Sequence, residues 1–143
     1  TIYTSASARC TQSAEIIAKL FKKKITTIDL PARNHGEWNG RSYEDIFDQY
    51  GPEVMLQQPE NGESLKDFNK RVSKTIDSLV EKNRGNRIIV VTTPDVIQSA
   101  IAKTLELSPV SQFKNLIKTG TLTQISYFEG NWSSVIYSDH MPV

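Results

Sequence analysis

Short apolar and β-branched runs alternate with helical stretches along this chain of 143 residues. Runs at residues 2–4, 24–30 and 88–93 are rich in Ile, Val, Thr and Leu, a composition typical of strands. The run at 88–93 is the most continuous, and we expect it to be the buried central strand of the sheet. Strands that alternate with helices predict an α/β three-layer sandwich with a mainly parallel sheet and helices on both faces.

Three stretches have the spacing of amphipathic helices. The clearest runs from residue 65 to 79, where apolar residues recur at three and four positions: Leu65, Phe68, Val72, Ile76 and Leu79. A second helix is predicted over residues 9–21, with a buried face made of Cys10, Ser13, Ala14, Ile17 and Phe21. A third is predicted over residues 95–105, directly after the run at 88–93.

The remaining segments predict a long loop and a hairpin. Residues 32–62 are rich in Gly, Pro, Asn and Gln, so we expect an excursion over one edge of the sheet, with a short helix near Tyr43–Phe47. The runs 122–128 and 132–139 flank the turn signal Glu-Gly-Asn. They predict an antiparallel hairpin at the far edge of the sheet.

Composition narrows the class of protein. The length is that of one domain, which we place at 1–143, and the net charge of +1 gives no reason to expect nucleic acid or an anionic membrane as a partner. The single Cys10 cannot form an internal disulfide, and no apolar run approaches the roughly 20 residues that cross a bilayer. We therefore expect a cytoplasmic protein without a metal or another cofactor. The chain starts without Met, directly in a strand, so we also expect residues upstream.

Two junctions between a strand and a helix are candidate binding sites, because ligands of parallel sheets bind at the carboxyl ends of the strands. At the first, small residues precede Arg9, whose planar guanidinium at a helix start suits a phosphate. An Arg in the first turn of a helix is more often a solvated surface residue, which is the alternative role for Arg9. At the second, Thr93, Pro94 and Asp95 suit the N-cap, the first position and the first turn of a helix. This capping role explains Thr93 without any catalytic function.

Five segments carry a resemblance to a known family. They are IYTSASARCTQSAEIIAKLF, HGEWNGRSYEDI, NGESLKDFNKRV, RIIVVTTPDVIQSAIA and the ending YSDHMPV, which contains His140. In their order and spacing they resemble the histidine phosphatase superfamily, the phosphoglycerate-mutase-like proteins. The resemblance covers nearly the whole chain. It implies the fold of that family and a phosphate-binding site at Arg9, Ser5 and Thr93.

The resemblance also implies that catalytic groups are missing. Members of the family typically transfer a phosphoryl group to a His in an RHG motif at the end of their first, central strand, and this sequence contains no RHG. The second family His corresponds to Thr93, and the Glu that protonates the leaving oxygen corresponds to Ala32. His35 is a candidate substitute acid because the ordinary pKa of His is near neutrality. We favour an ordinary loop position for it.

Three functions follow as hypotheses. We favour a degenerate histidine-phosphatase-like domain, a pseudoenzyme that binds a phosphate-bearing ligand or a protein partner without turnover. The alternative is an active phosphomonoesterase, phosphoglycerate-mutase-like or α-ribazole-phosphatase-like, whose nucleophilic His lies in an upstream segment. A purely structural domain is the third.

The apparent absence of the family's first strand also has a consequence for the sheet. A missing strand leaves exposed strand edges, and exposed edges recruit other strands. We therefore expect a rearranged sheet, self-association or a partner strand, or another piece of this chain in the vacant position.

Overall fold

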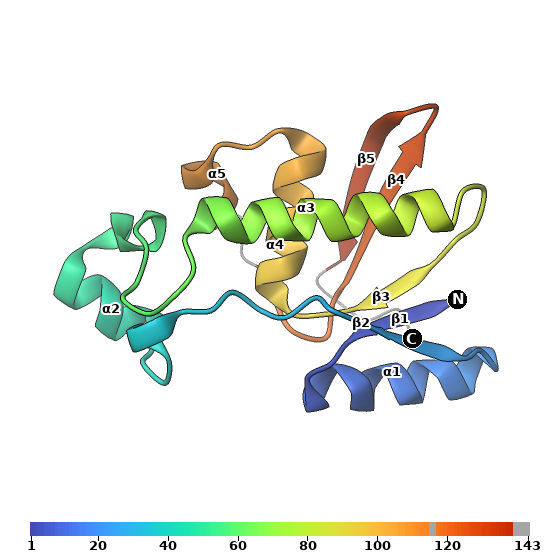
Figure 1. The fold of residues 1–143 in the computed structure, drawn as a ribbon, viewed down its shortest axis with the longest axis horizontal. Helices are drawn as coiled ribbons and strands as arrows, with labels where there is room; N and C mark the ends of the chain where they lie inside the picture. Colours follow the sequence, from blue (N-terminus) through green and yellow to red (C-terminus); the bar gives the residue numbers. More distant parts are fainter. Residues whose placement is uncertain (115–116, 139–143) are drawn as a thin grey trace.

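The main sheet holds three parallel strands in a computed structural model that describes residues 1–114 and 117–138. The strands are β1 (Ile2–Ser5), β2 (Ile25–Ile28) and β3 (Ile89–Val91), in the order β2-β1-β3 (Figure 1). Each is a short β-branched run, as the pattern of the chain predicts. The predicted α/β fold with a mainly parallel sheet is confirmed.

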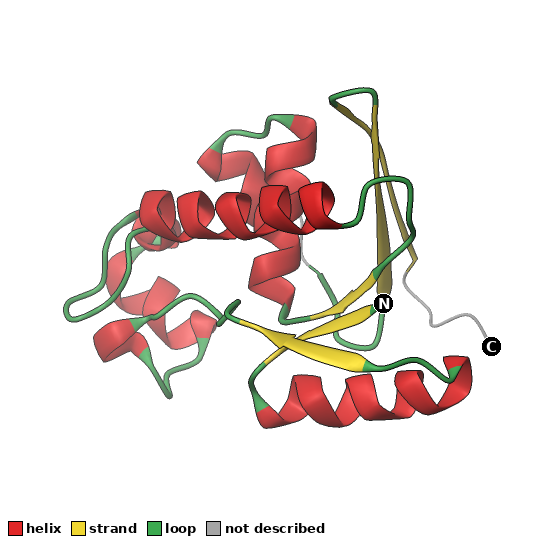
Figure 2. Cartoon of the chain, turned by 45° about the vertical axis from the view of Figure 1, so that its right-hand side comes forward, coloured by secondary structure: helices red, strands yellow, loops and turns green. Residues whose placement is uncertain are grey.

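Helices cover both faces of this sheet (Figure 2). On one face α1 (Ala8–Phe21) packs against the strands through a buried cluster that includes Ile2 and Ala14. On the other face α3 (Leu65–Lys82) and α4 (Pro94–Leu105) enclose a second cluster, made of Leu30, Leu65, Phe68, Val72 and Val96. Full burial of one such aliphatic or aromatic side chain contributes roughly 1.5–3 kcal/mol, so these clusters hold the three layers together.

The predicted buried stripe of α3 is observed. The helix begins after Ser64, whose hydroxyl accepts the backbone N–H of Asp67 and so satisfies one of the free donors of the first turn. Four of the five predicted stripe residues are buried, and Ile76 is half-buried against the same cluster.

The predicted buried face of α1 is partly wrong. Cys10 and Ala14 are buried as expected, but Ser13 is exposed and Phe21 is 59% exposed. A helix of 14 residues spans about 21 Å, whereas a strand of four residues spans about 13 Å. The last turn of α1 therefore extends beyond the strands, and Phe21 has no sheet to cover it.

The excursion over residues 32–62 contains three short helical segments. They are the 3₁₀ helix η1 (Gly36–Trp38), the α-helix α2 (Tyr43–Tyr50) and the 3₁₀ helix η2 (Pro52–Leu56). A small core of their own holds them together, made of Trp38, Ile46, Val54 and Met55. The short predicted helix near Tyr43 exists and is one turn longer than expected.

Two expectations for the sheet are corrected. The run at 88–93 forms β3, but among the described residues β3 pairs only with β1, is half-buried and lies at an edge of the main sheet, while β1 is central. The predicted hairpin forms from β4 (Leu122–Phe128) and β5 (Asn131–Ser138), yet it is a separate two-stranded sheet. No strand of the described residues pairs with the other edge of β3.

Between α4 and the hairpin lies α5 (Pro109–Lys114), which the sequence pattern did not indicate.

His140 and most of the ending YSDHMPV lie outside the described residues. Among the helices of residues 1–114 and 117–138, none is long and apolar enough to cross a membrane.

Candidate anion-binding site

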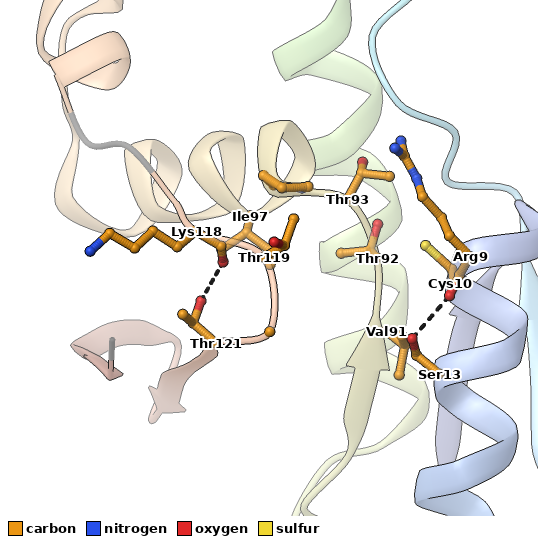
Figure 3. A pocket seen from close by; sticks show the side chains of 12 residues that line it. Arg9, Cys10, Ser13, Val91, Thr92, Thr93, Ile97, Lys118, Thr119 and Thr121 are labelled. Carbon is orange, nitrogen blue, oxygen red and sulfur yellow. Dashed lines mark hydrogen bonds between the residues drawn. The ribbon is translucent and has the colours of Figure 1, made fainter. Parts of the chain in front are cut away.

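Two neighbouring pockets lie at the carboxyl ends of β1 and β3, where α1 and α4 begin. One, of about 210 Å³, is lined by the start of α1, the residues after β3 and the segment Lys118–Thr121 (Figure 3). The other, of about 130 Å³, is lined by Ser5–Ser7, Arg9, Thr93 and the segment Ile28–Ala32. Arg9 and Thr93 line both pockets. The structure thus brings together the residues that the sequence analysis assigns to phosphate binding.

Arg9 provides the positive charge of this site. It lies in the first turn of α1, is exposed, and extends its side chain past Cys10 toward Thr93 (Figure 3). Within the described part of the chain its guanidinium forms neither a hydrogen bond nor an ion pair. No acidic residue lies in the first turn of α1 to compete for that end of the helix. All of the guanidinium donors are thus available to an anion.

Ser5 lines the smaller pocket, but its hydroxyl is already used to hold the strand ends together. Its hydroxyl is buried, donates to the carbonyl of Leu30 over 2.7 Å and lies 2.8 Å from the hydroxyl of Thr92. These two bonds join the ends of β1 and β3 to the chain that leaves β2. An anion at Ser5 would compete with bonds that already hold the strand ends together.

Thr93 is the N-cap residue of α4, with Pro94 in the first turn, as the sequence analysis predicts. Its hydroxyl, however, does not cap the helix; it donates to the carboxylate of Asp95. Asp95 Oδ2 accepts the backbone N–H of Arg33. Asp95 Oδ1, which accepts the Thr93 hydroxyl, also accepts the backbone N–H of Val96. Asp95 therefore places a negative charge on the positive end of α4 and partly offsets its attraction for an anion.

Ala32 lines the smaller pocket with a methyl group, which can neither donate nor accept a proton. Its backbone is held by Arg71, which donates to the carbonyls of Pro31 and Ala32 and forms an ion pair with Glu63 at 2.6 Å. Burial raises the pKa of Glu63, but the hydrogen bonds from Arg71 and Asn34 outweigh it and hold that pKa below its ordinary value. Arg71 and Glu63 thus hold this loop in place, and their charged groups are already bound to one another and to the loop backbone.

His35 lines neither of the two pockets. It is half-buried, and its ring meets the edge of the Tyr43 ring with 6.2 Å between centroids. Burial, and then the charge of Arg33, lower the pKa of His35 below its ordinary value. The ring is therefore mainly neutral at pH 7 and is a poor proton donor there.

The sequence analysis missed the residue that organises this region, Arg33. Only 4% of Arg33 is exposed, and its guanidinium donates to the carbonyls of Met55, Gln57 and Glu63 at 3.0–3.1 Å. These bonds tie η2 and the start of α3 to the loop after β2. No sequence signal marked Arg33, because an Arg in a polar loop is usually solvated.

The sequence analysis also missed the far wall of the larger pocket. The segment Lys118–Thr121 precedes β4 and lies across the pocket from Arg9, although the ammonium group of Lys118 points away from it (Figure 3). Cys10, buried, lines the same pocket. The described ranges hold no group of three or more His, Cys, Asp or Glu residues that could bind a metal ion.

Fold and site together define an α/β protein with a basic pocket at the carboxyl edge of a parallel sheet. The sequence profile of the histidine phosphatase superfamily (branch 1) matches residues 1–140. The chain belongs to this superfamily, so the resemblance found in its motifs is confirmed.

Three proteins that resemble this chain are each longer than it. Phosphoglycerate mutase-like protein 4 of Arabidopsis thaliana is 26% identical over 150 aligned residues, which cover 96% of this chain and 64% of that protein. A phosphoserine phosphatase of Entamoeba histolytica, solved with 3-phosphoglyceric acid, superposes with a TM-score of 0.83 at 21% identity, over 97% of this chain and 74% of its own. The α-ribazole phosphatase of Shigella flexneri gives a TM-score of 0.77 at 20% identity, over 99% and 75%. At these identities the two structures show the fold alone.

Proposed function

We propose that this chain binds a small phosphate-bearing ligand at the carboxyl ends of β1 and β3 and does not turn it over. The observation that carries the proposal is the free guanidinium of Arg9, which lines both pockets together with Thr93. A planar guanidinium with unoccupied donors at a helix start is a suitable phosphate ligand. Membership of a phosphatase superfamily and a relative solved with 3-phosphoglyceric acid support phosphate as the ligand class.

The chemistry of the neighbouring side chains supports binding without turnover. Thr93 donates its hydroxyl proton to Asp95, and Ala32 offers only a methyl group. His35 is mainly neutral at pH 7 and lines neither pocket. Loss of a general acid alone reduces a rate about 10²–10⁴-fold.

A second function has one observation in its favour. The larger pocket lies beside the edge of β3 with which no described strand pairs, so an additional segment of chain there could bring a His next to Arg9. The chain would then be part of an active phosphomonoesterase, of the phosphoglycerate-mutase-like or α-ribazole-phosphatase-like kind. This alternative differs from the first in requiring a nucleophile that residues 1–143 do not supply.

Binding is tested by thermal and urea unfolding with inorganic phosphate and with 3-phosphoglycerate. Because Asp95 offsets part of the attraction, we expect millimolar affinity, and a ligand at ten times its Kd then stabilises the fold by about 1.4 kcal/mol. Arg9→Ala should abolish this stabilisation, whereas Arg87→Ala, at an exposed position before β3, should leave it unchanged. No response of the unmodified chain to either ligand would contradict binding.

Turnover is tested separately with p-nitrophenyl phosphate. We expect a rate no higher than the uncatalysed background. A clear rate from residues 1–143 that disappears in Arg9→Ala but persists in Arg87→Ala would overturn the proposal. A rate given only by the intact native chain, with any residues that precede Thr1, would favour the active phosphomonoesterase.

A further inference from the structure

The chain contains two Asn-Gly pairs, Asn39–Gly40 and Asn61–Gly62, and the structure holds them differently. In such a pair the backbone nitrogen of the Gly can attack the side-chain amide carbon of the Asn, because Gly has no Cβ to hinder the approach. Asn is accordingly among the thermally labile residues of proteins. Whether a pair reacts in the folded state depends on how freely the Gly nitrogen can move.

The pair Asn39–Gly40 lies in an exposed turn between η1 and α2. Among the residues that the structure describes, neither the Gly40 N–H nor the Asn39 side chain has a hydrogen-bond partner. Attack requires a rotation, because Asn39 is extended, with φ −58° and ψ 135°. A Cβ on Gly40 would meet nothing within 4 Å, so the backbone there has room to make this rotation.

The pair Asn61–Gly62 is exposed at the Asn and fixed at the Gly. The Gly62 N–H donates to the carbonyl of Pro59 over 3.0 Å, so this nitrogen is already in use. A Cβ on Gly62 would lie 2.9 Å from both the carbonyl oxygen of Asn34 and the nitrogen of Gly36, which are backbone atoms. Reaction at Asn61 therefore requires a hydrogen bond to break and two packed segments to separate.

We propose that Asn39 is a site of spontaneous deamidation in the folded protein, whereas the fold protects Asn61. The Gly40 nitrogen forms a bond to Asn39 Cγ and the Cγ–Nδ2 bond breaks, so the amide leaves as ammonia with the former Gly40 proton. Water then opens the cyclic imide. Opening at Cγ gives aspartate with an ordinary peptide bond, and opening at the backbone carbonyl gives isoaspartate, whose main chain runs through the side chain.

The products change the excursion over residues 32–62. Either product adds a negative charge, and isoaspartate also adds one atom to the main chain between Asn39 and Gly40. The segment already holds six acidic side chains: Glu37, Glu44, Asp45, Asp48, Glu53 and Glu60. The Arg41 N–H donates to the carbonyl of Trp38 over 3.1 Å, and this bond spans the added atom. Since Trp38 is buried in the small core of the excursion, isoaspartate should loosen that core.

The direct test is peptide mapping by mass spectrometry of the 143-residue protein during incubation at neutral pH. Asn39 should deamidate at least about fivefold faster than Asn61, which is the factor that a single hydrogen bond contributes. In urea the two pairs should react at similar rates, because each is then an Asn-Gly pair in an open chain. Equal rates in a protein that circular dichroism shows to be folded would overturn the proposal. So would a rate difference that persists unchanged in urea, since the flanking residues would then cause it.

Isoaspartate is identified by methyl transfer from S-adenosylmethionine with an isoaspartyl methyltransferase, which leaves ordinary aspartate unmodified. The label should appear in the peptide that holds residue 39. It should be absent from Asn39→Gln, whose longer side chain would have to close a larger ring, and present in the matched control Asn61→Gln. A label that persists in Asn39→Gln would overturn the assignment to Asn39.

Trypsin measures the loosening of the excursion. The bond after Arg41, at an exposed position, should be cut several-fold faster in incubated protein that carries isoaspartate than in fresh protein. In Asn39→Gln, incubated and fresh protein should be cut equally. Unchanged cleavage of protein that carries isoaspartate at position 39 would overturn the loosening. Phosphate binding is measured on fresh protein, so the two proposals fail independently.

Discussion

The backbone N–H of Arg33 donates to Asp95 Oδ2 over 2.7 Å, across 62 positions of sequence. This bond joins the loop after β2 to the first turn of α4. The other carboxylate oxygen, Oδ1, accepts the Thr93 hydroxyl and the Val96 N–H. The Asp95 carboxylate therefore holds the loop after β2 against the start of α4, so it has a structural role in addition to its place at the helix end.

Replacing Asp95 by Asn tests this structural role. An amide of the same shape has one acceptor oxygen where the carboxylate has two, so one of the three donors loses its partner. We expect the free energy of unfolding to fall by about 1–3 kcal/mol. Urea unfolding measures it, and Asp48→Asn on the exposed face of α2 should stay within about 0.5 kcal/mol of the unmodified chain. Equal effects of the two substitutions would contradict a structural role for Asp95.

Arg33→Met should be among the more destabilising single changes in the chain. It removes three hydrogen bonds from a buried guanidinium and leaves the carbonyls of Met55, Gln57 and Glu63 without these donors. The expected loss in the free energy of unfolding is at least about 3 kcal/mol. The matched control is Arg84→Met, because Arg84 pairs with Glu81 on the surface and exposed pairs contribute little. Similar losses for both variants would show that Arg33 does not organise the loop.

The sequence predicted the elements of the fold better than their arrangement. The stripe of α3 and the turn at Glu-Gly-Asn are local signals, because periodicity and turn chemistry act over a few residues. The position of β3 is different. A continuous apolar run indicates that both faces are covered, and they are, but it does not reveal how many neighbours pair along the edges. The run was therefore predicted as the central strand although it lies at an edge of the sheet that the described residues form.

The site could be predicted only in part for the same reason. Arg9 was found because a strand-to-helix junction has a recognisable sequence and a known place in a parallel sheet. Arg33 donates hydrogen bonds to three carbonyls from segments distant in sequence, and no local sequence pattern predicts such contacts. The segment Lys118–Thr121 reaches the pocket through the path of the chain after α5, which the sequence analysis did not predict at all.

Stability at acid pH should depend on Glu63. Its folded-state pKa lies below the ordinary value of 4.5, as its bonds to Arg71 and Asn34 outweigh the effect of burial. Above the unfolded-state pKa the ion pair contributes fully to stability. As the pH falls through 4.5 and then through the folded-state pKa, the unfolded chain binds the proton first and this contribution is lost.

Glu63→Gln should therefore lower stability at pH 7 and flatten the further loss between neutral and acid pH. Urea midpoints over that range measure the difference. Glu15→Gln, at an exposed position on α1, should keep the steep acid dependence of the unmodified chain. A Glu63→Gln variant with the unmodified acid dependence would show that another carboxylate controls it.

Gly36 and Gly40 offer a matched test of how closely the loop after β2 packs on the segment before α3. Both have a positive φ, +51° and +79°, that disfavours any other residue, so Ala at either position costs about 1–2 kcal/mol from the backbone alone. A Cβ on Gly36 would lie 2.1 Å from the carbonyl oxygen of Glu60, a backbone atom, whereas a Cβ on Gly40 meets nothing within 4 Å. Gly36→Ala should therefore destabilise by about 1–3 kcal/mol more than Gly40→Ala, since overpacking adds to the strain. Urea unfolding of the two variants measures this difference directly, and equal losses would mean that the segment at Glu60 moves aside and does not hold this loop in place.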